Sequence, residues 1–204
     1  MVKIKICGIK TFADINIVNE LHPDYIGFVF VKSSKRYITP EIAKLLKKEL
    51  DKSIKVVGVF VNENIDNIVS LVNYNIIDLI QLHGNEDTNY IKILKNRVNC
   101  PIIKTFIIHS EEDVSYVQYS NADYIMLDSG MGTGKSFNHQ YIRNINREFF
   151  LAGGLNFKNV ASAISNYKPY AVDVSSSVET NGIKDKNKMQ QFINVIRKED
   201  DIYE

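Results

Sequence analysis

The chain has 204 residues, of which 45% are hydrophobic and 24% charged, and its formal net charge at pH 7 is +1. This composition is that of a globular domain, and it excludes collagen-like repeats and long disordered tracts. A charge so near zero gives no general attraction to nucleic acid or to an anionic membrane, so any anionic ligand has to be held by a local pocket.

Short β-rich runs recur along the chain with amphipathic stretches between them, a pattern typical of βαβ units and a parallel sheet. Most of the runs are almost wholly apolar, as strands are when helices cover one face and packed side chains the other. Their number, about eight, predicts an α/β protein with the (β/α)8 TIM-barrel fold. In chain order the expected strands are Lys3–Cys7, Tyr25–Phe30, Lys55–Phe60, Leu79–Leu82, Ile102–Phe106, Tyr124–Asp128, Phe149–Ala152 and Ala171–Ser175.

Segments between the runs carry helix signals. Thr39 and Pro40 offer a capping side chain followed by proline at the first helical position. After Asp185 apolar residues recur at helical spacing, which predicts a last helix that closes the ring. These apolar residues are Met189, Phe192, Ile193 and Ile196. No linker or low-complexity tract divides the chain, so we expect one domain over residues 1–204, with 198–204 as a frayed acidic tail.

The two cysteines, Cys7 and Cys100, are too few and too distant in sequence for a disulfide framework or a zinc site. The chain enters the alternating run Val2–Ile6 directly, which leaves no room for a signal peptide. No apolar stretch approaches the roughly 18 residues of a membrane span. We therefore expect a cytoplasmic protein in a reducing compartment, without a bound metal.

In a (β/α)8 barrel the active site lies at the carboxyl ends of the strands, so the polar residues there are the candidates. Gly153 and Gly154 follow the seventh run, and Ser175, Ser176 and Ser177 follow the eighth. Backbone N–H groups and hydroxyls at these two ends favour a phosphate site, although the glycine pair alone also fits a tight turn. The other candidates are Cys7, residues 32–36, Asn62, Gln81, His83, Lys104, Asp128 and Asp173.

The stretch Ser129–Ser136 ends with the Gly-Lys-Ser triplet of a nucleotide-binding P-loop, and it follows an expected strand as such a loop should. The glycine that the motif requires five positions before Gly134 is replaced by Ser129, and Gly130 stands one residue too close. A shorter loop does not wrap a β-phosphate in the same way. Nucleotide hydrolysis is therefore a distant alternative.

Several blocks of residues lie at successive strand ends, and their combination and order form a specific motif pattern. They are Lys5–Lys10, Gly27–Phe30, Ser34–Tyr37, Val57–Asn62, Ile80–Gly84, Gly132–Gly134, Leu151–Leu155 and Val172–Ser176, with Glu179 and Gly182–Asp185. In this order, from Lys5 to Asp185, they resemble the phosphoribosylanthranilate isomerase family, barrel enzymes of tryptophan biosynthesis. Lys35, Met131, His139 and Ser177 stand where the family usually has Pro, Gly, Trp and Gly. A Cβ at Ser177 can crowd a loop whose backbone approaches the phosphate.

The resemblance implies an Amadori rearrangement of N-(5-phosphoribosyl)anthranilate to 1-(2-carboxyphenylamino)-1-deoxyribulose 5-phosphate. This reaction needs an acid for the furanose oxygen and a base for the C2 proton, and no cofactor. The resemblance assigns Asp128 as the acid and Cys7 as the base. Asp128 then has to stay partly protonated through burial, and Cys7 needs an electropositive or N–H-rich setting that brings its pKa below about 8.5. By position alone, Asp128 is equally a turn or cap residue, and Cys7 is more often a small buried hydrophobe.

The resemblance also implies substrate-binding residues. Arg36 is expected to clamp the anthranilate carboxylate, because its planar fork matches a carboxylate, whereas an exposed arginine is otherwise solvated. His83 either contacts the substrate or is a structural histidine. Lys5 is assigned no part, because it faces the same side as Cys7 only if Cys7 keeps the strand register. The expected set is completed by Gly132, Gly153, Gly154, Asp173, Ser175, Ser176 and Ser177.

Two other functions stay open. One is another phosphosugar isomerase on a barrel, such as the related aminoaldose isomerase of histidine biosynthesis, but that enzyme is expected to pair two carboxylates, which Cys7 argues against. The other is a non-catalytic phosphosugar-binding protein, against which the presence of Cys7, Asp128 and Arg36 argues. The expected partner is the small phosphosugar–anthranilate substrate, with no nucleic acid and no membrane, and the chain is either a monomer or a homodimer.

Overall fold

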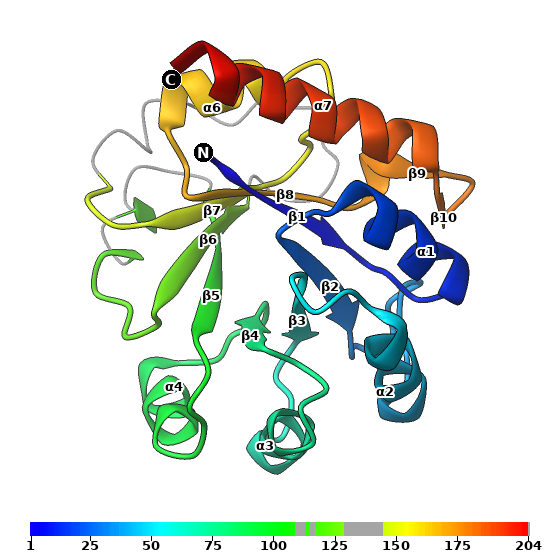
Figure 1. The fold of residues 1–204 in the computed structure, drawn as a ribbon. Helices are drawn as coiled ribbons and strands as arrows, with labels where there is room; N and C mark the ends of the chain where they lie inside the picture. The colour runs from blue at the N-terminus through cyan, green and yellow to red at the C-terminus, as the bar shows by residue number, and fades with distance from the viewer. Residues whose placement is uncertain (109–112, 115–116, 129–144, 204) are drawn as a thin grey trace.

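The computed structural model describes residues 1–108, 113–114, 117–128 and 145–203. Eight parallel strands, β1 to β8, close into a barrel in sequence order (Figure 1). The strands are β1 Lys3–Cys7, β2 Tyr25–Val29, β3 Lys55–Phe60, β4 Leu79–Leu82, β5 Ile102–Ile107, β6 Tyr124–Asp128, β7 Phe149–Ala152 and β8 Ala171–Val174. The predicted barrel is confirmed: β2, β5 and β8 end one residue from the expected position, and the others have the expected bounds.

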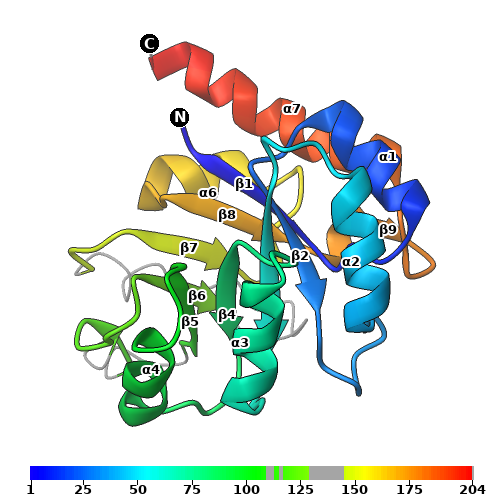
Figure 2. The same cartoon turned by 60° about the horizontal axis from the view of Figure 1, so that its bottom comes forward.

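Helices cover the outside of the barrel, as Figure 2 shows for α2, α3 and α4 in front of the neighbouring strands. The helices are α1 Phe12–Leu21, α2 Pro40–Glu49, α3 Ile65–Asn73, α4 Thr88–Lys95, α6 Val160–Tyr167 and α7 Lys186–Tyr203. α2 begins as predicted, with the Thr39 side chain accepting a hydrogen bond from the Ile42 N–H and with Pro40 as its first residue. Among the described residues, no helix is both long enough and apolar enough to cross a membrane.

α7 packs against α1 and α6 and completes the ring. Its four predicted apolar residues, Met189, Phe192, Ile193 and Ile196, are fully buried. The helix runs on to Tyr203, so the expected acidic tail begins as a continuation of α7. Fraying of this end in solution stays a prediction.

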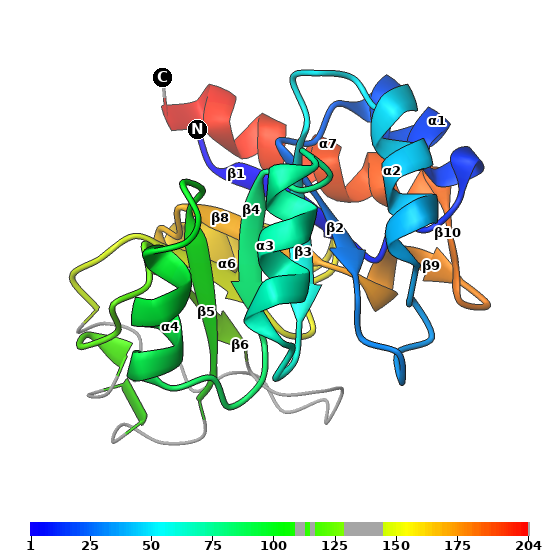
Figure 3. The same ribbon diagram turned by 90° about the horizontal axis from the view of Figure 1, so that it is seen from below.

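Between β8 and α7 the chain forms the short helix η2, Ser176–Val178, and a two-stranded hairpin of β9, Glu179–Thr180, and β10, Ile183–Lys184. Asn181 and Gly182 form the turn of this hairpin, and both have positive φ angles, 53° and 77°. An Asn-Gly pair is the preferred sequence for such a turn. Figure 3 shows the hairpin beside the carboxyl end of β2.

The interior of the barrel is apolar at one end and polar at the other. Tyr124 and Tyr170 stack at the amino-terminal end with ring centroids 5.1 Å apart, and Phe150 packs against both. Toward the carboxyl ends of the strands, the buried side chains include Lys5 and Gln81. The aromatic residues therefore close the amino-terminal end of the barrel, and the polar groups gather at the carboxyl ends of the strands, where an active site is expected.

Candidate active site

Cys7 is the last residue of β1, and its side chain points into the barrel, where it packs with Val29 and Val59. It is 8% exposed and faces Gly27 on β2, its partner in the strand register. A Cβ at position 27 would lie 2.6 Å from the Cys7 sulfur. Glycine at this position therefore provides the space in which the thiol sits.

Lys5 lies on the same inner face as Cys7, two residues earlier in β1. It is completely buried, and its Nζ lies 2.7 Å from Asp173 Oδ1. The alternation of β1 thus continues through Cys7, and Lys5 faces the same side of the barrel as the thiol. Burial alone would lower the pKa of Lys5, but the charges of Asp173 and Cys7 raise it above its usual value. The ammonium therefore stays charged inside the barrel.

The surroundings of Cys7 are electropositive, but they do not lower its pKa as expected. Burial raises the pKa of the thiol, and the nearby charges of Lys5 and Lys184 offset only part of that effect. The pKa of Cys7 therefore lies above its ordinary value. The expected lowering of this pKa below 8.5 is not found.

Asp128 ends β6, and its side chain is 18% exposed at the mouth of the barrel. His83, directly after β4, faces it, with 3.8 Å between His83 Nε2 and Asp128 Oδ2. The other imidazole nitrogen, Nδ1, lies 3.0 Å from Gln81 Nε2. Burial lowers the pKa of His83 and outweighs the opposite effect of Asp128, so the imidazole is neutral near pH 7.

Arg36, in the segment between β2 and α2, forms a bidentate ion pair with Glu179. Its Nε and Nη2 donate to the two carboxylate oxygens at 2.7 Å each. Lys184 donates to the same carboxylate at 2.7 Å and to the Ser175 carbonyl at 3.0 Å. Burial alone would raise the pKa of Glu179, but the hydrogen bonds from Arg36 and Lys184 bring it down to about 2. Arg36 is therefore paired at the barrel mouth, with 28% of its side chain exposed.

Gly8 explains how Arg36 reaches this position. Its φ angle is 85°, in the left-handed region, and a Cβ built on it would lie 2.3 Å from the Arg36 Cδ. Both facts favour glycine directly after Cys7. The sequence Cys7-Gly8 thus combines an inward thiol with room for the arginine.

The two predicted phosphate loops lie next to each other after β7 and β8. Gly153 and Gly154 both have positive φ angles, 89° and 66°. Ser175 precedes η2, and its hydroxyl donates to the Cys7 carbonyl at 3.1 Å, while Ser176 begins η2. The eighth-strand loop is therefore tied directly to the end of β1.

The hydroxyl of Ser177 donates a hydrogen bond to the carbonyl of Leu155, which joins the two loops. Ser177 is not among the residues with positive φ, so a side chain is tolerated there without backbone strain. Of the other predicted positions, Gly132 and the P-loop-like stretch 129–136 lie outside the described residues.

Comparison with known proteins decides between the possible functions. The model of the N-(5'-phosphoribosyl)anthranilate isomerase family matches residues 4–195. The N-(5'-phosphoribosyl)anthranilate isomerase of Endomicrobium trichonymphae is 44% identical over 202 residues, which cover 97% of this chain and 99% of that protein. The chain belongs to this family.

Solved structures agree. The phosphoribosyl anthranilate isomerase of Thermotoga maritima superposes with a TM-score of 0.89 at 37% identity, over 97% of this chain and 100% of that chain. A phosphoribosyl anthranilate isomerase in complex with reduced 1-(O-carboxyphenylamino)-1-deoxyribulose 5-phosphate superposes with a TM-score of 0.87 at the same identity, over 97% and 100% of the two chains. The predicted family and fold are confirmed, and the chain is an isomerase of tryptophan biosynthesis.

Most of the isomerase's predicted site residues lie at one end of the barrel. Cys7 and Asp128 end β1 and β6, which are three strands apart around the ring. The phosphate loops and Asp173 lie between these strands, on β7 and β8.

Two groups of the isomerase site were not assigned from the sequence. The first is the pair Glu179 and Lys184, which appeared only within the family blocks. Glu179 and Lys184 are register partners in the β9–β10 hairpin. The Asn-Gly turn between them is the signal that could have predicted this pairing.

The second group is a buried network behind His83. Glu86, which was not predicted, accepts hydrogen bonds from the N–H groups of Asn62 and Gly84 at 2.7 and 2.9 Å. Lys104 donates to Glu86 at 2.8 Å and to the Gly84 carbonyl at 2.6 Å. The network fixes the loops after β3 and β4, and so the position of His83. No sequence pattern pairs Glu86 with Lys104.

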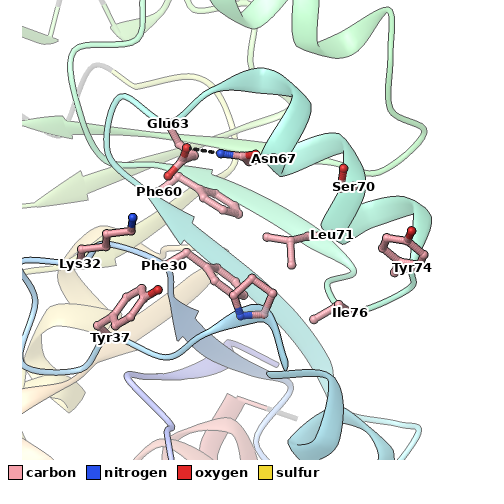
Figure 4. A pocket seen from close by; sticks show the side chains of 11 residues that line it. Phe30, Lys32, Tyr37, Phe60, Glu63, Asn67, Ser70, Leu71, Tyr74 and Ile76 are labelled. Carbon is pink, nitrogen blue, oxygen red and sulfur yellow. Dashed lines mark hydrogen bonds between the residues drawn. The ribbon is translucent and has the colours of Figure 1, made fainter. Parts of the chain in front are cut away.

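A separate apolar groove of about 390 Å³ lies outside the barrel between α2 and α3 (Figure 4). Phe30 and Phe60 stack at its base with centroids 5.3 Å apart, and Lys32 and Glu63 lie at its edge. None of the predicted catalytic residues lines it. Within the described part of the chain, no group of three His, Cys, Asp or Glu side chains is arranged to hold a metal ion.

Proposed function

We propose that the protein converts N-(5'-phosphoribosyl)anthranilate to 1-(2-carboxyphenylamino)-1-deoxyribulose 5-phosphate, with Cys7 as general base and Asp128 as general acid. The observation that carries the proposal is the position of these two groups at one mouth of the barrel, flanked by two anion-binding features. The phosphate loops lie on one side, and Arg36 on another. The relative crystallised with the reduced product analogue supports this substrate class.

The phosphate of the substrate binds between the loops after β7 and β8. Gly153 and Gly154 have positive φ angles and no side chains, so a phosphate can approach their backbone N–H groups closely. Ser175 and Ser176 add hydroxyls and the start of η2. The bond from Ser177 to the neighbouring loop holds the two halves of this site together.

The anthranilate carboxylate binds Arg36. A guanidinium has five N–H donors, and among the described residues Glu179 accepts from two of them. Glu179 also fixes the plane of the guanidinium, so the remaining donors need little reorientation when the carboxylate arrives. Asp173, which Lys5 holds in the barrel interior, faces the sugar hydroxyls.

Two proton transfers follow. Asp128 donates a proton to the furanose oxygen, so that the ring opens to an iminium ion, and the Cys7 thiolate removes the C2 proton to give the enolamine. The positive iminium favours the thiolate electrostatically, which offsets the effect of burial on the pKa of Cys7. Neutral His83 contacts the substrate beside Asp128.

The test is to generate phosphoribosylanthranilate in situ and to follow the loss of its anthranilate fluorescence. The proposal predicts rapid loss with the native protein. The aminoaldose substrate of the histidine-pathway isomerase, supplied in the same assay format, is expected to react much more slowly. No loss above the uncatalysed rate, or a preference for the histidine-pathway substrate, contradicts the proposal.

The protein acts in the cytoplasm on this small molecule, without a nucleic-acid, membrane or cofactor partner. One relative, from Thermotoga maritima, is described as dimeric. For this chain both a monomer and a homodimer are compatible with a site whose described residues come from one subunit. Light scattering of the purified protein distinguishes the two states.

A further inference from the structure

Lys5 is a buried charge at the centre of the site that the mechanism above does not use. Its side chain has no exposed surface, its Nζ lies 2.7 Å from Asp173 Oδ1, and Cys7 lies two residues further along the same inner face of β1. A lysine is almost never fully buried unless its charge is paired. A leucine or methionine would fill the same space at lower cost, so a buried ammonium indicates a need for its charge or its hydrogen bonds.

The charges around Cys7 suggest what that need is. Lys5, Arg36 and Lys184 act on the thiol as cations and Asp173 acts on it as an anion. A second carboxylate pairs two of the cations, so these groups together carry one net positive charge while Cys7 is protonated. Loss of the thiol proton makes the whole cluster neutral. The charged groups are Lys5 on β1, Arg36 between β2 and α2, Asp173 on β8, Glu179 on β9 and Lys184 on β10.

These cations are not equivalent. Arg36 and Lys184 share Glu179 as their hydrogen-bond acceptor. Lys5 is the cation on β1 itself, two residues before Cys7, and Asp173 fixes its ammonium from the neighbouring strand. Its charge lowers the pKa of the Cys7 thiol more than the charge of Lys184 does.

We propose that Lys5 is a positioning residue for the reaction, whose fixed positive charge stabilises the proton-accepting thiolate of Cys7. Asp173 orients the Lys5 ammonium and, as an anion, opposes the thiolate. The inference rests on the proposed role of Cys7 as base. The competing explanation is that the Lys5–Asp173 pair only joins β1 to β8.

The two explanations differ in how the thiol titrates. If the Lys5–Asp173 pair is only structural, removing either partner loosens the barrel and has the same kind of effect on Cys7. If Lys5 acts through its charge, removing Lys5 and removing Asp173 shift the pKa of the Cys7 thiol in opposite directions. Lys5 lowers the pKa of the Cys7 thiol, and Asp173 raises it.

The experiment measures the rate of Cys7 alkylation by iodoacetamide against pH, in full-length protein with Cys100→Ser to remove the second thiol. Native Lys5 is compared with Lys5→Met, which keeps the length of the side chain, and with Asp173→Asn, which keeps its shape. Circular dichroism controls for folding. The assay reads the thiol without any turnover.

We expect Lys5→Met to slow alkylation at least tenfold at pH 8 and to move the midpoint upward by at least one pH unit. Asp173→Asn is expected to move the midpoint downward. The proposal is overturned if both midpoints stay at the native value or both move in the same direction. If Lys5→Met does not fold, the sign of the Asp173→Asn shift decides alone, and an upward shift overturns the proposal.

Turnover then separates this inference from the proposed function. With active native protein, kcat of Lys5→Met is expected to fall at least tenfold at neutral pH and to recover as pH rises, while KM changes little. A pH-independent loss contradicts the role of Lys5. An inactive native protein that still shows opposite titration shifts refutes the proposed reaction, and leaves the Lys5–Cys7 coupling established.

Discussion

Glu179→Gln tests how the ion pairs at the barrel mouth contribute to stability. The native carboxylate accepts two hydrogen bonds from Arg36 and one from Lys184, and its side chain is 8% exposed. Glutamine keeps the size but removes the charge, and it leaves two cations close together. We therefore expect the variant to be less stable at neutral pH.

The magnitude follows from the pKa of Glu179. A fall from the ordinary value of 4.5 to about 2 corresponds to about 3.5 kcal/mol, at roughly 1.4 kcal/mol per pKa unit. The Arg36 side chain is 28% exposed, so solvent screens part of the interaction. About 2 kcal/mol is a realistic contribution.

The pH dependence has a definite sign. Because the pKa is lowered in the folded protein, the contribution of Glu179 is fully present above 4.5, and it is lost as pH falls from 4.5 toward about 2. The difference in unfolding free energy between the native protein and Glu179→Gln should thus be largest at pH 7 and shrink progressively below pH 4.5.

Urea unfolding followed by circular dichroism at several pH values between 2.5 and 7 measures this difference. Glu20→Gln is the matched control, because Glu20 pairs with Lys186 at the exposed surface, and the native profile should be retained. A difference that is absent at pH 7, or that does not change below pH 4.5, refutes the reasoning.

Three further substitutions probe the site. Gly27→Ala places a Cβ 2.6 Å from the Cys7 sulfur, so we expect it to lower the free energy of unfolding by about 1–3 kcal/mol. We also expect kcat to fall more than 1/KM, and unchanged kinetics would show that the thiol can move freely. Lys104→Met leaves Glu86 buried without its cation, which should cost about 3–5 kcal/mol in urea unfolding, and a stable variant contradicts the network's role. Ser177→Gly removes one hydrogen bond between the phosphate loops, which is expected to cost about 1 kcal/mol and to raise KM, as steady-state assays can check.

The strands were predictable because each is a short apolar run bounded by polar residues, and this pattern is local. The bounds of β1, β3, β4, β6 and β7 match the prediction. The helix signals at Thr39 and after Asp185 are equally local, and both helices begin there. Such features are set by residues within a few positions of one another.

The missing parts of the site depend on contacts between distant segments. Lys5 and Asp173 are 168 residues apart in the sequence, and they meet only because the barrel closes with β1 beside β8. Arg36 meets Glu179 only because the hairpin folds beside the end of β2. The wrong expectation for the pKa of Cys7 has the same origin, because the burial of its side chain is a property of the closed barrel.

The central claim is that Cys7 and Asp128 move the protons in a site that binds the substrate independently of them. The most direct measurement combines kcat of Cys7→Ala and Asp128→Asn with their affinity for the reduced product analogue, determined by calorimetry. We expect kcat to fall about 10²–10⁴-fold in each variant, while the dissociation constant stays within a few-fold of the native value. A variant that retains native kcat, or that loses turnover only in proportion to its loss of analogue binding, contradicts the assignment of that residue.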